Sequence, residues 1–210
     1  MSNFNEIQNT LITGDIDKLS TLVKQALDSG TAAKSILDDG LIKGMDIVGD
    51  KMQSGDMFIP EVLRSAKAMS DVLDELRPLL SEDDISTSGK VIIGTVKGDH
   101  HDIGKNLVGM MLETVGFEVI DLGVDVEPEA IVDSVKSNLA NVVALSALLT
   151  TTMPAMKETI EALTEAGMRD GVHIVIGGSP VTQQYADKIG ADGYASDAGA
   201  ACKLVKRLVG

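Results

Sequence analysis

The chain has 210 residues, a formal net charge of −14 and one cysteine, Cys202. This length fits either a single α/β domain or a small helical domain joined to a domain of roughly 120 residues. The acidic balance argues against nucleic-acid binding, which draws on clustered Lys and Arg. A lone cysteine excludes both an internal disulfide framework and a zinc site built from cysteines.

Aromatic side chains make up 2% of the residues and Trp is absent, so a surface for stacking nucleic-acid bases is not expected. No apolar run reaches the roughly 20 residues of a transmembrane helix. The first residues, MSNFNEIQNT, contain neither a basic region nor a hydrophobic signal core. We therefore expect a soluble, cytoplasmic protein.

Residues 1–80 are predicted to be helical throughout. Apolar side chains recur at helical spacing in the stretches Leu19–Leu27, Ile36–Val48 and Val62–Leu76. Together with the first segment, these stretches predict a four-helix bundle with short connections. The loop before the last helix carries Met57, Phe58 and Ile59, large apolar side chains that either pack in the core or form a hydrophobic lid over a ligand.

Residues 81–89 are polar and lack periodicity, so they are interpreted as a linker. After it, strand-like and helical stretches alternate, which predicts a parallel sheet with helices on both faces, a flavodoxin- or Rossmann-like α/β domain over residues 90–210. The expected strands are Lys90–Val96, Phe117–Asp121, Val142–Ser146, His173–Ile176 and Gly193–Ala195.

In such a sheet, the loops that follow the carboxyl ends of the strands lie along one edge, and ligands bind there. Three of these loops are chemically distinctive. Gly98–Gly104 contains two histidines and two aspartates, Ser146–Thr152 is small and rich in hydroxyls, and Gly177–Pro180 begins with two glycines. We expect all three to contribute to one site.

The first of these loops contains a possible metal ligand. A neutral imidazole binds a transition metal through one nitrogen while a carboxylate holds the proton on the other, and Asp99 is close enough in sequence to do this for His101. Gly104 would let the backbone pass beneath a bulky planar group, and Lys105 is expected on the helix surface. A solvated turn, a zinc site and an acid–base pair are alternative interpretations of the loop.

The motifs Asp99-x-His101-x-x-Gly104, Ser146-x-Leu148 and Gly177-Gly178 occur in this order, each after a predicted strand. In this respect the chain resembles cobalamin-binding domains, and Gly55–Val62 resembles part of the helical cap of that family. The resemblance covers nearly the whole chain. It is closest to the small corrinoid methyl carriers that serve methylamines, methanol, betaines or aryl methyl ethers, and extends to the cobalamin-binding region of methionine synthase.

The resemblance implies a cofactor and its ligand. The cofactor would be cobalamin or a related cobamide, in the methylcob(III)amide and cob(I)amide states. His101 would be the lower axial ligand of the cobalt, and Asp99 would hydrogen-bond to His101.

The resemblance also implies roles for the remaining motif residues. Ser146, Leu148 and Thr150 would line the slot for the nucleotide tail of the cofactor, and Gly177-Gly178 would let that tail pass along the sheet edge. Phe58 would cover the upper face of the cofactor. Residues 1–80 would then be a cap that swings on the linker.

By the same resemblance, the protein is a methyl carrier in one-carbon metabolism, as in methanogenesis or acetogenesis, and is not an enzyme on its own. Its partners would be a substrate-specific methyltransferase, a second methyltransferase with a thiol or tetrahydrofolate-type acceptor, and a reductive activase. Neither nucleic acid nor membrane is expected as a partner.

Three alternatives compete with the methyl carrier. A cobalamin-dependent sensor or regulator has the same two-domain core but usually adds a DNA-binding or signalling domain, and the charge of −14 disfavours it. A small subunit of an adenosylcobalamin mutase is disfavoured because a 5′-deoxyadenosyl group would not fit beneath a methyl-type cap. The last alternative is a flavodoxin-like module without cobalt.

Overall fold

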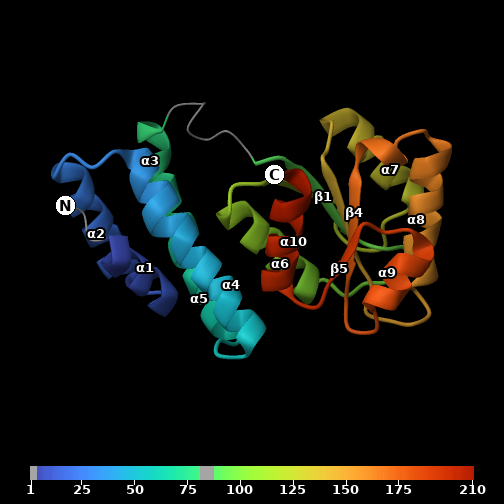
Figure 1. Cartoon of the computed structure of the whole chain (residues 1–210), viewed down its shortest axis with the longest axis horizontal. Helices are drawn as coiled ribbons and strands as arrows, with labels where there is room; N and C mark the ends of the chain where they lie inside the picture. Colours follow the sequence, from blue (N-terminus) through green and yellow to red (C-terminus); the bar gives the residue numbers. More distant parts are fainter. Residues whose placement is uncertain (1–3, 81–87) are drawn as a thin grey trace. The chain divides into compact units, whose positions relative to one another are not determined.

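The computed structural model describes residues 4–80 and 88–210. They form two compact units, one built chiefly from the helices before residue 81 and the other chiefly from the residues after 87 (Figure 1). Residues 81–87 of the predicted linker lie outside the described part of the chain. No helix in the described ranges is long and apolar enough to cross a membrane.

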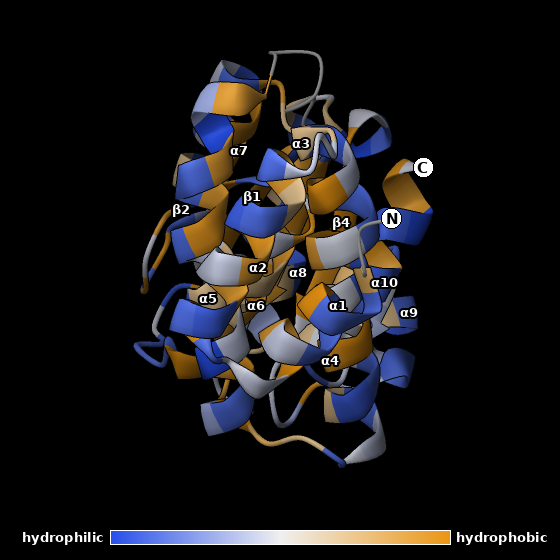
Figure 2. Cartoon of the chain, turned by 90° about the vertical axis from the view of Figure 1, so that its left-hand side faces the viewer, coloured by the Kyte–Doolittle hydropathy of each residue, from blue (hydrophilic) through white to orange (hydrophobic). Residues whose placement is uncertain are grey.

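The first unit is the predicted helical bundle. Its helices are α1 (Phe4–Thr13), α2 (Ile16–Asp28), a long third helix made of α3 (Ala33–Ser35), η1 (Ile36–Ile42) and α4 (Lys43–Ser54), and α5 (Ile59–Leu76), which ends in the 3₁₀ turn η2 (Arg77–Leu79). Each ribbon alternates between hydrophilic and hydrophobic stretches (Figure 2). The apolar faces meet in a core that includes the fully buried Leu11, Leu41 and Met69, which confirms the predicted bundle.

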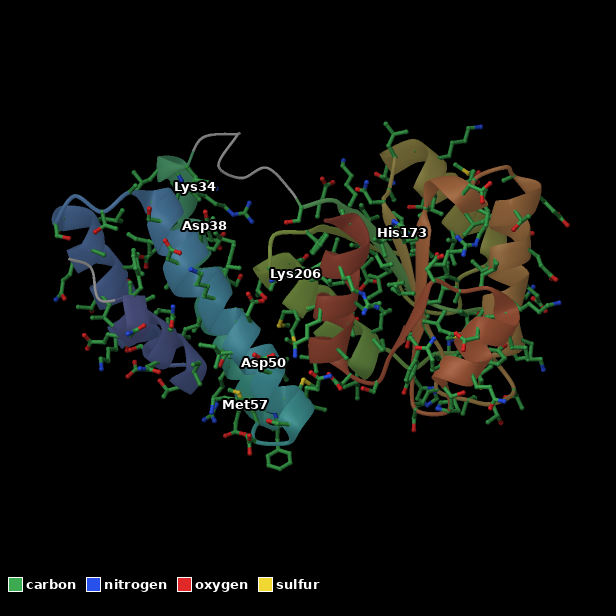
Figure 3. All side chains as sticks on the ribbon, in the orientation of Figure 1. Lys34, Asp38, Asp50, Met57, His173 and Lys206 are labelled. Atoms are coloured by element: carbon green, nitrogen blue, oxygen red, sulfur yellow. The ribbon has the colours of Figure 1, made fainter. Side chains whose placement is uncertain are left out.

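The long third helix contains a π-helical segment, η1, in its first half. Here the backbone hydrogen bonds follow an i→i+5 pattern, which is rare outside short insertions into α-helices. Lys34 of α3 and Asp38 of η1, labelled in Figure 3, form an ion pair of 3.2 Å across the start of the π-helical segment. Gly44 just beyond η1 allows α1 to pack closely, because a Cβ there would lie 2.8 Å from Leu11 Cδ2.

The turn from α4 to α5 has clear local causes. Gly55 ends α4 in the left-handed conformation at φ 81°, which glycine adopts without steric cost. The Phe58 amide donates to Glu61 Oε2 at 2.9 Å and so caps the start of α5. Within this turn, Met57 is buried and Phe58 is 69% exposed (Met57 is labelled in Figure 3).

The second unit is a five-stranded parallel sheet with strand order β2-β1-β3-β4-β5. The strands are β1 (Lys90–Thr95), β2 (Glu118–Asp121), β3 (Val142–Ser146), β4 (His173–Gly177) and β5 (Gly193–Ala195). They match the predicted strands to within one residue at each end. This order is that of the flavodoxin-like doubly wound fold, which confirms the predicted fold class.

Helices cover both faces of the sheet (Figure 1). α6 (Ile103–Thr114) and α10 (Ala198–Val209) lie on one face, and α7 (Pro128–Asn138), α8 (Pro154–Glu165) and α9 (Gln183–Ile189) lie on the other, with the short 3₁₀ turn η3 (Arg169–Gly171) before β4. The strands β1, β3 and β4 are buried almost throughout, as expected for parallel strands covered on both faces. Ile92, Val143 and Met156 belong to the core between the sheet and the second helix group.

The strand order reverses at β1, because β2 lies on one side of it and β3 on the other. Such a reversal opens a crevice at the carboxyl ends of the strands. Beyond β2, the chain continues along β1: Thr95 donates its amide to Gly123 O at 3.0 Å, and Val96 forms an isolated bridge with Val126. The loop after β2 is therefore tied to the loop after β1.

Candidate functional site

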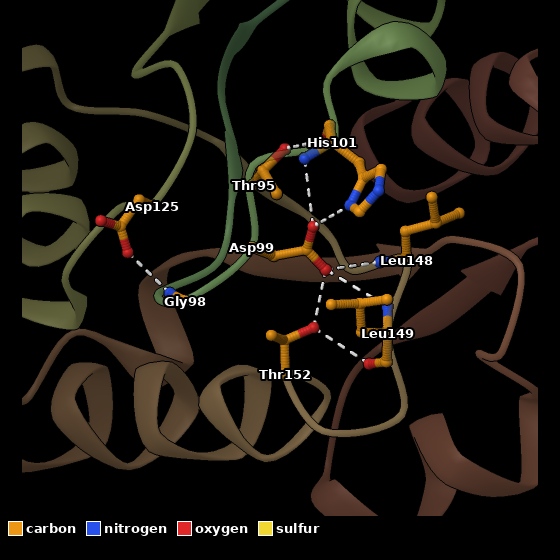
Figure 4. A network of polar contacts seen from close by, with 8 residues as sticks. All are labelled: Thr95, Gly98, Asp99, His101, Asp125, Leu148, Leu149 and Thr152. Atoms are coloured by element: carbon orange, nitrogen blue, oxygen red, sulfur yellow. Dashed lines mark hydrogen bonds and ion pairs between the residues drawn. The ribbon is translucent and has the colours of Figure 1, made fainter.

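The three loops singled out in the sequence meet at one edge of the sheet. The ladder pairs Thr95 with Ser146 and Ser146 with Gly177, so β1, β3 and β4 end at the same level. The loops after β1 and β3 are joined by a network of hydrogen bonds centred on Asp99 (Figure 4).

Asp99 holds His101 by two contacts to the same oxygen. Asp99 Oδ1 lies 2.7 Å from His101 Nδ1 and accepts the His101 backbone N–H at 3.1 Å. The Asp99 side chain is fully buried, whereas that of His101 is 50% exposed. Because an ionised carboxylate only accepts hydrogen bonds, Nδ1 carries the ring proton of a neutral His101, and the lone pair lies on Nε2.

The other oxygen of Asp99 is bound by the loop after β3. Oδ2 accepts the amide of Leu148 at 2.8 Å, the amide of Leu149 at 3.3 Å and the hydroxyl of Thr152 at 2.6 Å. Burial alone would raise the pKa of Asp99, but the hydrogen bonds from Thr152, His101 and the Leu148 amide outweigh it and hold this pKa well below its ordinary value. Asp99 is therefore a carboxylate throughout the physiological pH range.

The β1 loop is also fixed from its other side. Thr95 Oγ1 donates to the carbonyl of His101 at 2.8 Å. From the loop after β2, Asp125 Oδ1 accepts the amide of Gly98 at 2.6 Å (Figure 4). The Asp125 amide in turn donates to Asp99 O at 2.9 Å. Both flanking loops thus hold the turn that carries His101.

The two glycines at the end of β4 lie where the backbone approaches neighbouring backbone closely. Gly178 has φ 124°, and a Cβ at this residue would lie 1.9 Å from Ala147 O. At Gly177, a Cβ would lie 3.1 Å from Ala195 O. The β4 loop therefore packs directly on the β3 loop at the point where Ala147 donates its amide to Gly177 O at 3.2 Å.

Other predicted site residues in this unit line the same edge. Ser146 is half-buried at the end of β3, while Leu148 and Thr150 are exposed on the loop after it. Gly104 is exposed in the first turn of α6, and a Cβ there would meet no atom within 4 Å. Phe58 belongs to the helical unit.

Two residues differ from the sequence-based expectations. Thr152, which was not among the predicted site residues, supplies the hydroxyl that contacts Asp99. The sequence feature that could have indicated Thr152 is the run of threonines after β3, of which only Thr150 was predicted to be a site residue. Lys105 was wrongly expected on the surface: it is 3% exposed and forms an ion pair with Asp121.

The site suits a large ligand that brings its own metal. Among the described residues, no hydrogen bond is found to His101 Nε2, and a neutral imidazole of fixed tautomer is a good ligand for a transition metal. The edge around it carries exposed apolar side chains, notably Ile103 at 76% and Leu148 at 42%. Together with the open space over Gly104, these features fit a corrinoid, a metal macrocycle with apolar and polar edges.

Comparison with known proteins agrees with this geometry. Two family models described as B12 binding domains match residues 89–203 and 4–77. A corrinoid protein from Desulfitobacterium hafniense is 40% identical, with 100% of this chain and 99% of the relative aligned. The trimethylamine corrinoid protein of Methanosarcina barkeri is 43% identical over 93% of this chain and 91% of its own length.

Two solved structures extend the comparison. A cobalamin-binding protein from D. hafniense DCB-2 superposes with a TM-score of 0.87 and 32% identity, covering 100% of both chains. The methanol:cobalamin methyltransferase complex MtaBC from M. barkeri contains a chain that superposes with a TM-score of 0.81 and 30% identity, covering 97% of this chain and 78% of that one.

Fold and site together define a protein that binds a B12-type cofactor. The chain belongs to the family of corrinoid proteins that join a helical B12-binding domain to an α/β B12-binding domain.

Proposed function

We propose that this chain is a methyl carrier that works between two methyltransferases, with His101 as the lower ligand of its corrinoid. When bound, the corrinoid supplies a cobalt centre that can accept a methyl group from one molecule and give it to another. The observation that carries the proposal is the His101–Asp99 pair, in which Asp99 holds Nδ1 and no hydrogen bond from the described residues reaches Nε2.

The residues of the chain would fix and tune this ligand. Asp99 keeps the proton on Nδ1. It also makes the lone pair of Nε2 a better ligand for a metal, because a carboxylate partner raises the basicity of the imidazole. Thr152 and the amides of the β3 loop keep Asp99 in place. Ser146, Leu148, Thr150, Gly177 and Gly178 would receive the nucleotide tail of the cofactor along the same edge.

The relatives indicate what the partners do. They include dimethylamine, monomethylamine and trimethylamine corrinoid proteins of Methanosarcina species, and one similar structure is a methanol:cobalamin methyltransferase complex. We infer that one partner is a methyltransferase specific for a small methylated compound. The other partners would be a second methyltransferase, with a thiol or a tetrahydrofolate-type acceptor, and a reductive activase.

The helical unit would complete the carrier. In this proposal, residues 1–80 are a cap, residues 81–89 are the linker that lets the cap move, and residues 90–210 hold the cofactor. Phe58, exposed at the start of α5, would shield the upper face of the corrinoid. Domain motions of this kind commonly gate access to a reactive centre.

Reconstitution with a cobamide tests the proposal. The wild-type protein should bind it and show the absorption spectrum of a corrinoid with a nitrogen ligand. His101→Ala should abolish that spectral signature, whereas His100→Ala, which alters the neighbouring exposed histidine, should retain it. An unchanged spectrum in His101→Ala would overturn the assignment of the ligand, and an equal effect of both variants would show that the ligand is not specifically His101.

A further inference from the structure

Asp125, in the loop after β2, has an unusual backbone conformation. Its φ of 54° lies in the left-handed region, which only one other non-glycine residue, Leu139, adopts in the described part of the chain. Aspartate and asparagine tolerate this region better than other side chains that carry a Cβ. Two hydrogen bonds, one accepted by its carboxylate and one donated by its amide, hold Asp125 in this conformation.

Asp125 contacts the two residues that lead into the histidine turn. Its carboxylate accepts the amide of Gly98 at 2.6 Å, and its own amide donates to Asp99 O at 2.9 Å. Gly98 is itself left-handed, with φ 80°. The two hydrogen bonds clamp the segment Gly98–Asp99 at its two ends, at the Gly98 N–H and at the Asp99 carbonyl. Figure 4 shows the first of them, on the side of Asp99 opposite to the β3 loop.

The position of this segment determines where His101 lies. The Asp99 carboxylate contacts both the backbone amide and the ring of His101. A movement of Asp99 would therefore move the imidazole with it. Metal ligation requires distances that hold within a few tenths of an ångström, so a looser Gly98–Asp99 segment would weaken a metal bond through His101 Nε2.

We propose that Asp125 is a positioning residue for the His101 ligand: it fixes the two ends of the segment Gly98–Asp99 and thereby aligns the imidazole for cobalt. The inference rests on the proposed function and adds a residue that lies in neither the Asp-x-His motif nor the loop after β3. Asp125 is exposed, so its hydrogen bonds contribute less to global stability than buried ones do. Its substitution should therefore alter ligation more than folding.

The test compares Asp125→Ala with Asp125→Asn. Asparagine keeps an oxygen acceptor and tolerates the left-handed backbone, whereas alanine loses the acceptor. In the cobamide-loaded protein, Asp125→Ala should reduce the fraction with a nitrogen-ligated spectrum and weaken cobamide binding about tenfold, equivalent to about 1.4 kcal/mol. Asp125→Asn should behave like the wild type. The exposed Asp133 on α7, changed to Ala, is the control for loss of one negative charge.

A second readout needs no cofactor. Amide hydrogen exchange of Gly98, whose N–H the Asp125 carboxylate accepts, can be followed by NMR in the apo protein. It should accelerate in Asp125→Ala and remain slow in Asp125→Asn and Asp133→Ala. Wild-type exchange and a wild-type spectrum in Asp125→Ala would overturn the positioning role. Equal damage in Asp125→Asn would also overturn it, because the negative charge and not the hydrogen-bond geometry would then be responsible.

The same measurements separate this inference from the proposed function. If His101→Ala leaves the cobamide spectrum unchanged, the proposed function fails. If His101→Ala alters the spectrum but Asp125→Ala does not, the function stands and the positioning role alone is overturned.

Discussion

Lys105 and Asp121 form an ion pair in which only the lysine is buried: the side chain of Lys105 is 1% exposed and that of Asp121 is 44% exposed. The pair joins the first turn of α6 to the end of β2. Lys105 Nζ also donates to Asn106 Oδ1 at 2.6 Å. A buried ammonium without a charged partner is costly, whereas a half-exposed carboxylate is solvated by water.

The two halves of this pair should therefore respond unequally to substitution. Asp121→Asn leaves the charge of Lys105 buried without its partner and should lower the free energy of unfolding by about 3 kcal/mol. Lys105→Met removes the buried charge itself and should cost about 1 kcal/mol or less. Urea unfolding measures both free energies.

The exposed pair Lys97–Glu127, 2.8 Å apart, provides the control: Glu127→Gln should lower the free energy of unfolding by less than about 1 kcal/mol. Equal losses in the two test variants would contradict the asymmetry.

The pKa of Asp99 predicts how the site responds to acid. Its folded pKa lies below the ordinary value of about 3.9, so the unfolded chain binds a proton at a higher pH than the folded one. The stabilisation by Asp99 is present above pH about 4 and is lost as the pH falls further towards the folded pKa. Asp99→Asn should lower the unfolding free energy by about 3 kcal/mol at pH 7, and by progressively less below pH 4. A difference from wild type that stays constant with pH would contradict this.

Thr152 should prove as important to the site as the residues predicted from sequence. Thr152→Val keeps the shape but removes the donor to Asp99, leaving one site of a buried carboxylate unfilled, and should cost about 2 kcal/mol. Thr152→Ser keeps the hydroxyl and should cost less. Thr150→Val, at an exposed position of the same loop, is the matched control and should change the apo stability by less than about 0.5 kcal/mol. Thermal unfolding compares all three.

Two glycine substitutions should separate folding from binding. Gly178→Ala places a methyl group against Ala147 O at a left-handed residue and should destabilise the apo protein by about 3 kcal/mol or more. Gly104→Ala meets no atom of the chain within 4 Å and lies in a helix, so it should stabilise the apo protein by about 0.5 kcal/mol. If Gly104 lies against the cofactor as proposed, the same change should weaken cobamide binding. Unfolding and cobamide titration of both variants measure these effects.

The fold was largely predictable because its periodicities are simple. Buried parallel strands appear as short apolar runs such as Val142–Ser146. Glycines mark the ends of two other strands, with Gly123 shortly after β2 and Gly178 directly after β4. The π-helical segment was not predictable from the pattern, because the buried Ile36, Leu37 and Leu41 also fit an α-helix.

Contacts between site residues were predictable from the sequence where both residues lie in one loop. They were less predictable where the two residues lie in different loops. Asp99 and His101 are two residues apart, so their contact could be foreseen. Asp125 acts from 27 positions away on Gly98, and no local pattern marks that pairing. The burial of Lys105 likewise depends on Asp121 from another strand, so a charged residue near the start of an amphipathic helix was expected to face water.

The π-helical segment of the bundle gives the third helix tolerance to changes in chain length. In an α-helix, deleting one residue rotates everything beyond it by about 100°, so removal of Asp46 from α4 would turn the buried Val48 away from the core. Within η1, one fewer residue instead converts the i→i+5 turns towards ordinary α-helical ones. Deletion of Asp38 should therefore leave a folded bundle, while deletion of Asp46 should not, and circular dichroism of the two shortened proteins would show it. On this basis, the sequences of related chains should vary in length at 36–42 more readily than at 43–54.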